Sequence, residues 1–154
     1  MRTEAIPMEN LAQLLDVQLQ HGLAPLQVTG YSMHPTFRDR KDTVMLRAFD
    51  GKLKKGDVIL YRRDNGRYIL HRVISSPKVD VFLCAGDNQY ISERVCSRQV
   101  LAVVESFSRG KKTVHSGDFL YRLYVWAWIG LFPVRKPLLA LRRRLGRLRR
   151  KTKK

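Results

Sequence analysis

Short β-rich runs separated by turn residues fill the chain between residues 26 and 107. The predicted strands cover residues 26–29, 43–47, 58–62, 68–74, 81–85 and 100–107. The Asn65-Gly66 pair is typical of a two-stranded hairpin and joins the third run to the fourth. No helical pattern separates the runs, so the sequence predicts an antiparallel, mainly β domain.

Length and composition allow one ordinary soluble domain. The chain has 154 residues, of which 44% are hydrophobic and 28% charged, which excludes a low-complexity disordered chain and a polytopic membrane protein. We divide it into an N-terminal helical segment (1–25), the β domain (26–110) and a C-terminal segment (111–154). Leucines at helical spacing predict an amphipathic helix over residues 9–21, with Asn10 as its N-cap and Gly22 as its stop.

Positive charge is concentrated at the C-terminus. The net charge is +17, and residues 111–154 carry fourteen basic residues against one acidic residue. Residues 119–134 hold six of the fourteen aromatic residues, and nine of the last thirteen residues are basic. This order predicts a helix at an anionic membrane surface, whereas the alternative is a helix packed on the β domain with a solvated tail.

Other site types receive little support from the sequence. Cys84 and Cys96 are too few for a four-cysteine zinc site, and a disulfide between them is allowed but not required for a chain of this length. We expect no metal and no cofactor, because there is no zinc-ligand spacing and no glycine-rich phosphate loop. The N-terminus has no secretory signal, so we expect the body to remain in the cytosol.

A serine follows a glycine where the first predicted strand ends. Gly30 permits a tight turn that can expose the hydroxyl of Ser32. Taken alone, Ser32 is an ordinary turn serine, and a serine nucleophile needs a base from elsewhere in the fold. Of the four histidines, His71 is the one inside a predicted strand, where a side chain is well positioned to act as a base.

Four motifs in this part of the chain resemble type I signal peptidases. They are Gly-x-Ser-Met-x-Pro-Thr at 30–36, Lys-Lys-Gly-Asp-Val-Ile at 54–59, Leu-His-Arg-Val at 70–73 and Gly-Asp-Asn at 86–88. The resemblance covers residues 26–107. It implies the antiparallel β fold shared with LexA-like autoproteases, an extended peptide-binding groove and serine endopeptidase activity. His71 replaces the lysine of most bacterial members, as in the endoplasmic-reticulum and sporulation-type branch.

The resemblance also implies roles for individual residues. Ser32 would be the nucleophile and its backbone N–H an oxyanion donor, with His71 as general base. Glu93 stands where the histidine branch has an aspartate and would orient His71, with Asp87 as the competing candidate. Gly30 replaces a serine that often supplies a second oxyanion donor, so that donor is missing here.

The expected function is cleavage of a peptide or protein precursor at a membrane surface. No membrane span precedes Ser32, and the basic tail favours the cytoplasmic leaflet, so we expect a peripheral protein on the cytoplasmic face. One alternative is an inactive module of the same fold that binds peptides or a partner. Another is a nucleic-acid binder that uses the basic tail, which we do not favour because the aromatics form an apolar block.

Overall fold

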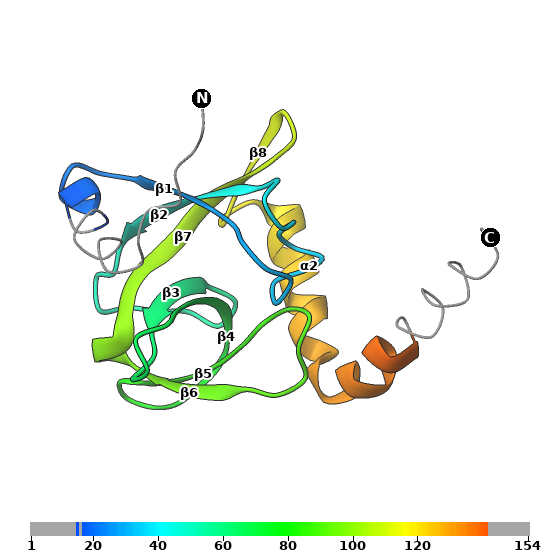
Figure 1. Ribbon diagram of the computed structural model, residues 1–154. Coiled ribbons are helices and arrows are strands. Elements are labelled where there is room, and N and C mark those ends of the chain that lie inside the picture. The colour runs from blue at the N-terminus through cyan, green and yellow to red at the C-terminus, as the bar shows by residue number, and fades with distance from the viewer. Residues whose placement is uncertain (1–14, 16, 142–154) are drawn as a thin grey trace.

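The structure is a computed structural model that describes residues 15 and 17–141 (Figure 1). The strands are β1 (Ala24–Gln27), β2 (Thr43–Ala48), β3 (Val58–Arg62), β4 (Tyr68–Lys78), β5 (Val81–Ala85), β6 (Glu93–Cys96), β7 (Val100–Arg109) and β8 (Lys112–His115). Short 3-10 helices cover Ser97–Gln99 and Phe132–Val134, and the α-helix α2 covers Phe119–Gly130. Residues 135–141 are also helical.

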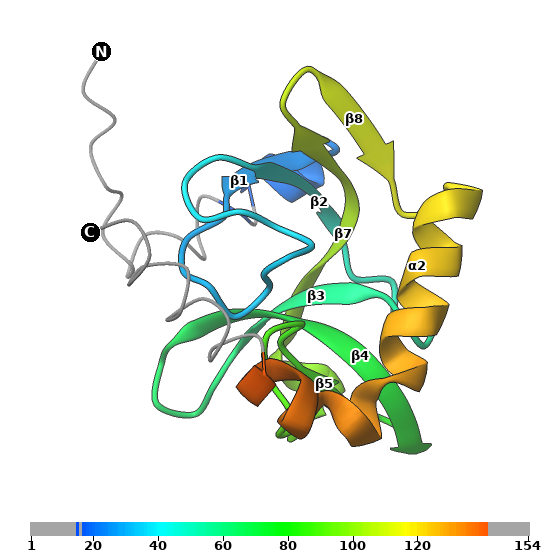
Figure 2. The ribbon, with the colours of Figure 1, turned by 90° about the vertical axis from the view of Figure 1, so that its right-hand side faces the viewer.

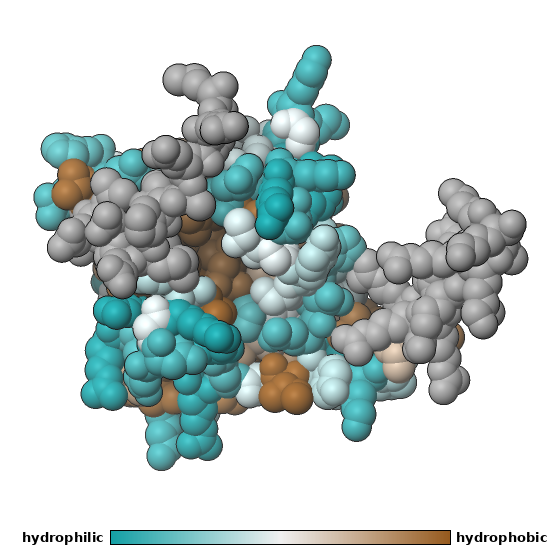
Figure 3. All heavy atoms as spheres, in the orientation of Figure 1, coloured by the Kyte–Doolittle hydropathy of each residue, from teal (hydrophilic) through white to brown (hydrophobic). Residues whose placement is uncertain are grey.

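All strand pairs are antiparallel, in the order β1-β2-β7-β3-β4-β5-β6, with β8 paired to β7. The sheet curls into a half-barrel, so the mainly β, antiparallel architecture expected from the sequence is confirmed. From the direction of Figure 1, hydrophobic atoms are visible in a hollow between β1 and β2 above and β3 to β6 below (Figure 3). Helix α2 runs along one side of the body in two perpendicular views (Figures 1 and 2).

The predicted hairpin between β3 and β4 is present. Arg62 pairs with Tyr68 at its closed end, and Gly66 has a φ of 82°, which the turn requires and glycine adopts freely. The sheet also contains β6 and β8, which the sequence analysis did not predict. Because β8 pairs with β7 from Ser106 to Arg109, the sheet continues past residue 110. The expected N-terminal helix lies mostly outside the described residues, and its described end, residues 15 and 17–20, is helical.

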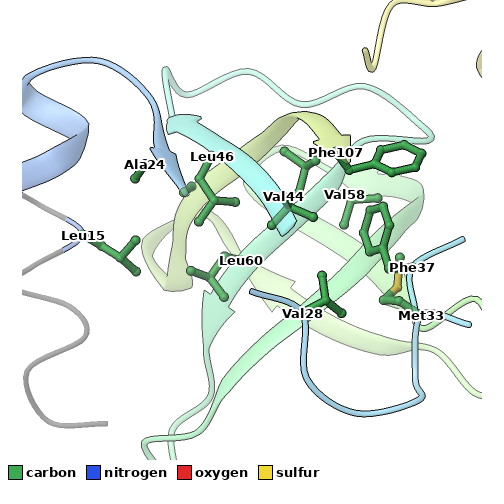
Figure 4. Close-up of a cluster of buried hydrophobic side chains, with 12 residues drawn as sticks. Leu15, Ala24, Val28, Met33, Phe37, Val44, Leu46, Val58, Leu60 and Phe107 are labelled. Carbon is green, nitrogen blue, oxygen red and sulfur yellow. The ribbon is translucent and has the colours of Figure 1, made fainter. Parts of the chain in front are cut away.

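Two hydrophobic clusters form the core, one on each side of β3. Val58 and Leu60 belong to the first cluster, and Ile59 and Tyr61 belong to the second, as the period of two in a strand requires. The loop after β1 contributes to the first cluster, and Figure 4 shows Met33 and Phe37 of this loop pointing into it. Met33 is 2% exposed and Phe37 0%, and burial of each contributes about 1.5–3 kcal/mol, which anchors the segment that carries Ser32.

No helix in the described part of the chain is long and apolar enough to cross a membrane. Helix α2 has twelve residues, whereas a span needs roughly 20.

Candidate active site

Ser32 lies in the loop between β1 and β2, directly after a left-handed turn at Gly30. Gly30 has a φ of 87°, and its N–H donates to Asp39 Oδ1 at 2.7 Å. A second hydrogen bond stabilises the loop after Ser32, where the N–H of Phe37 donates to the carbonyl of Met33 at 3.0 Å. The sequence-predicted role of Gly30 in a tight turn therefore agrees with the backbone geometry.

The segment 86–88 packs against the backbone of Ser32. The N–H of Asn88 donates to the Ser32 carbonyl at 2.8 Å. A Cβ atom on Gly86 would lie 2.5 Å from the same carbonyl oxygen, so no larger residue fits there. Among the described residues, neither the hydroxyl nor the backbone N–H of Ser32 has a hydrogen-bond partner, which leaves both groups free for a ligand.

His71 is the fourth residue of β4, paired with Ile59 of β3, and is 2% exposed. Its Nδ1 lies 3.2 Å from the hydroxyl of Tyr61 and 3.3 Å from Oε1 of Glu93. The sheet register explains this group. Tyr61 pairs with Ile69 and is therefore diagonal to His71 on the same face, and Glu93 reaches that face through its pairing with Cys84.

The hydrogen-bond directions fix the tautomer of His71. The Tyr61 hydroxyl donates its single proton to Oε1 of Glu93 at 2.5 Å, and an ionised carboxylate can only accept. Nδ1 of His71 must then carry the proton and donate toward Tyr61 Oη or Glu93 Oε1. Nε2 consequently holds the lone pair, which is the arrangement a general base for a serine hydroxyl needs.

Glu93 is ionised, and its carboxylate contacts Arg63 as well as Tyr61 and His71. Arg63 donates to its carboxylate through Nε at 2.8 Å and Nη2 at 2.6 Å. Partial burial alone would raise the pKa of Glu93, but the hydrogen bonds from Arg63 and Tyr61 and the Arg63 charge outweigh it and lower the pKa. Burial also raises the pKa of Tyr61, and its hydrogen bond to Glu93 adds to that effect, so Tyr61 remains a donor.

Burial lowers the pKa of His71 to about 4, although the negative charge of Glu93 opposes this shift. The ring is therefore neutral near pH 7. A neutral ring can accept a proton, and the nearby carboxylate can stabilise the imidazolium that would form.

Asp87 has a different partner from the one considered in the sequence analysis. Its carboxylate accepts from Arg72 Nε at 2.8 Å and Nη2 at 2.6 Å and from the hydroxyl of Thr36, and both members of the ion pair are fully buried. Burial alone would lower the pKa of Arg72, but the charge of Asp87 outweighs it and raises the pKa. Of the two acidic candidates, Glu93 contacts the His71 ring, and Asp87 ties β4 to the loop that carries Ser32.

The C-terminal helix completes this buried network. Tyr124 Oη lies 2.9 Å from Thr36 Oγ1, and Arg72 Nη1 donates to Tyr121 Oη at 3.2 Å. Arg135 is 0% exposed and donates to the carbonyls of Gly86 and Gln89 at 3.4 Å. The sequence analysis did not assign these residues to the site, although tyrosines three residues apart in an apolar run indicate a helix face with polar partners.

A groove of about 190 Å³ runs beside Ser32. It is lined by Leu26, Gln27, Val28, Thr29, Gly30, Ser32, Met33, Leu60, Tyr68, Ile69 and Leu70. Within the described part of the chain, β1 pairs only with β2, and residues 68–71 of β4 pair only with β3. Both flanks of the groove therefore offer strand edges to which an extended peptide could add hydrogen bonds.

Ser32 and His71 are not hydrogen-bonded to each other in this structure. Ser32 and Leu70, the neighbour of His71, line the same groove, but none of the described residues accepts from the Ser32 hydroxyl within 3.5 Å. Such contacts are often loose before substrate binds.

The two cysteines are free thiols. Cys84 pairs with Glu93 and Cys96 pairs with Val81, so they are at opposite ends of the β5–β6 ladder, too far apart along it to form a disulfide without rearrangement. Among residues 15 and 17–141, no group of three His, Cys, Asp or Glu side chains could hold a metal ion. Neither protein-family models nor curated proteins match this chain.

Proposed function

We propose that this protein is a serine endopeptidase of the type I signal peptidase kind, in which Ser32 attacks the peptide carbonyl and His71 accepts its proton. The observation that carries the proposal is the set of contacts at Nδ1 of His71, where Tyr61 and Glu93 hold the tautomer whose Nε2 is a base. The groove at Ser32, with strand edges on both flanks, supports an extended peptide as substrate. The fold shared with LexA-like autoproteases is part of the same proposal.

In this mechanism His71 takes the serine proton through Nε2 and later gives it to the leaving amine. Glu93 stays ionised and stabilises the imidazolium, and the free N–H of Ser32 donates to the oxyanion of the tetrahedral intermediate. The substrate must bring Ser32 and His71 into hydrogen-bond contact. These are the roles that the resemblance to type I signal peptidases implies for Ser32, His71 and Glu93. We further propose that cleavage takes place at a membrane surface, on the cytoplasmic face.

The test is a search for new peptide termini. Mass spectrometry should show cleavage products in cells that express the wild type, and intact precursors in cells that express Ser32→Ala. In vitro, Ser32→Ala and His71→Ala should each abolish cleavage of a precursor found in this way, and the double variant should be no worse, because the two residues act as a unit. Cleavage by a folded His71→Ala variant would contradict the mechanism.

A second candidate is an inactive peptide-binding module. Two observations favour it. Ser32 and His71 are not hydrogen-bonded to each other. In addition, Met33, next to Ser32, and Leu70 pack in the first hydrophobic cluster, whereas Tyr61, which contacts His71, belongs to the second. This candidate predicts that wild type and Ser32→Ala bind the same peptides with equal affinity and that neither cleaves them.

A further inference from the structure

Helix α2 is apolar on two faces, but only one of them is covered. Val125 and Ile129 are buried against the β body, where Gly56 allows a close approach, because a Cβ there would lie 2.8 Å from Val125 Cγ1. Tyr121 packs edge-on against Phe107 at 5.3 Å. A helix that is apolar all round is normally buried all round, so the second face requires an explanation.

The second face is exposed to solvent. Phe119 is 78% exposed, Leu120 77%, Leu123 52% and Trp126 76%, and their spacing of three and four residues places them on one side of the helix. We call these four residues the outer face of α2. Scattered single apolar residues need no explanation, but a contiguous apolar patch of this kind marks an interaction surface.

Positive charge borders the outer face. A groove of about 690 Å³ between α2 and the β body is lined by Trp126 together with Lys54, Lys55 and Arg122. These three cations are exposed, and the lining contains one carboxylate, Asp57, which accepts from the N–H of Lys54 at 2.7 Å. The sequence adds nine basic residues after residue 141.

We propose that the outer face of α2 and the cations beside it dock onto an anionic phospholipid surface. Apolar side chains that enter the headgroup region, next to lysine and arginine side chains that contact lipid phosphates, are what such a surface binds. A second copy of this chain is a poorer occupant, because its own cations would face Lys54, Lys55 and Arg122. Single-stranded nucleic acid is also a poorer occupant, because it requires aromatics interleaved with cations, whereas the outer face combines its two aromatics with two leucines.

This inference deepens the membrane-surface part of the proposed function, and it divides the aromatic segment between two surfaces. Tyr121, Tyr124 and Trp128 are turned toward the body, since Tyr124 stacks on Trp128 at 6.1 Å and both tyrosines join the polar network. Of the two tryptophans, Trp126 is the one whose side chain is available to lipid. The segment therefore packs on the β domain with one face and presents the other.

Vesicle co-sedimentation of the full chain tests the proposal. The wild type should bind vesicles of mixed phosphatidylcholine and phosphatidylglycerol and should not bind phosphatidylcholine alone. Leu120→Ser/Trp126→Ser should lower binding by about tenfold or more, since it removes two side chains that each bury substantial apolar area. The matched control is Val79→Ser/Ile91→Ser, which changes residues that are 88% and 70% exposed elsewhere and should bind like the wild type.

Two further variants sharpen the result. Lys54→Glu/Lys55→Glu should weaken binding and reduce its salt dependence. Ser32→Ala should bind vesicles like the wild type, so a failure of docking is distinguishable from a failure of the peptidase proposal. Unchanged binding by Leu120→Ser/Trp126→Ser would overturn the docking surface. Displacement of wild type from vesicles by single-stranded RNA, together with weaker RNA binding by that variant, would also overturn it and assign the surface to RNA.

Discussion

The single proton of the Tyr61 hydroxyl sets the state of the His71 ring. Because that proton goes to Glu93, the ring must donate from Nδ1. Glu93→Gln introduces an amide N–H that can donate to Nδ1 and stabilise the other tautomer. We expect kcat for peptide cleavage to fall by about 10²–10⁴-fold in Glu93→Gln. Glu93→Asp keeps a carboxylate and should retain most activity.

Asp87→Asn is the contrasting variant. Asp87 neutralises a buried arginine, so this change should lower stability more than Glu93→Gln does. Kinetics at a temperature where both variants are folded separates the two effects. If Asp87→Asn is inactive there while Glu93→Gln cleaves normally, the orienting role belongs to Asp87.

The buried His71 predicts an unusual pH dependence of activity. Its pKa is lowered to about 4 by burial, whereas an exposed histidine titrates near 6.5. The base is therefore neutral throughout the physiological range, and kcat/KM should be flat between about pH 6 and 8 and fall only on approach to pH 4. An activity that rises through pH 6.5 would show that His71 is solvated in the working enzyme.

The same shift predicts a pH dependence of stability. Below pH 6.5 the unfolded chain protonates His71, and the folded chain does so only near pH 4, so the unfolded state binds more protons between these values. The free energy of unfolding should fall as pH drops through this window, by about 3 kcal/mol. Urea titrations at several pH values give the free energy of unfolding as a function of pH. Between pH 6.5 and 4 this free energy should fall more steeply for the wild type than for His71→Gln, and parallel pH curves would contradict the burial of the ring.

At the level of elements, α2 belongs to the site as well as to the surface. Tyr121 and Tyr124 contact Arg72 and Thr36, and Arg135 holds two carbonyls of the loop that packs on Ser32. We expect truncation after Asp118 to lower the free energy of unfolding by more than about 3 kcal/mol, because Val125 and Ile129 leave the core. The truncated chain should also cleave a soluble peptide more slowly than the full chain. Full activity of a folded truncated chain would show that the site is independent of the helix.

Local patterns account for the elements that were predicted. Residues 58–62 and 81–85 were expected as strands and are β3 and β5 with those bounds, because each is a short continuous apolar run bounded by turn residues. Strand β6 has the polar sequence Glu-Arg-Val-Cys and exists through its pairing with β5. The contact of Tyr61 with His71 follows from the hairpin register, so Asn65-Gly66 could have revealed it. The contacts of Arg135 with residues 86 and 89 join distant segments, and no local pattern encodes them.

For the whole molecule, α2, which carries the proposed docking surface, packs on the sheet that also lines the groove beside Ser32 (Figures 1 and 2). A substrate on the same membrane would therefore be present at a high effective concentration. We expect a lipid-tethered peptide on anionic vesicles to be cleaved at least about tenfold faster than the same peptide in solution. High salt should remove the difference, because it screens the cations. Equal rates on and off vesicles would contradict membrane-surface cleavage.

The two faces of α2 also decide how this protein can be handled in the laboratory. An exposed apolar helix invites aggregation, and its removal is the usual remedy, but here the inner face carries Tyr121, Tyr124 and the buried Val125 and Ile129. A well-behaved sample for crystallography or inhibitor screening should therefore keep the helix and replace only Leu120, Leu123 and Trp126 with polar helix formers.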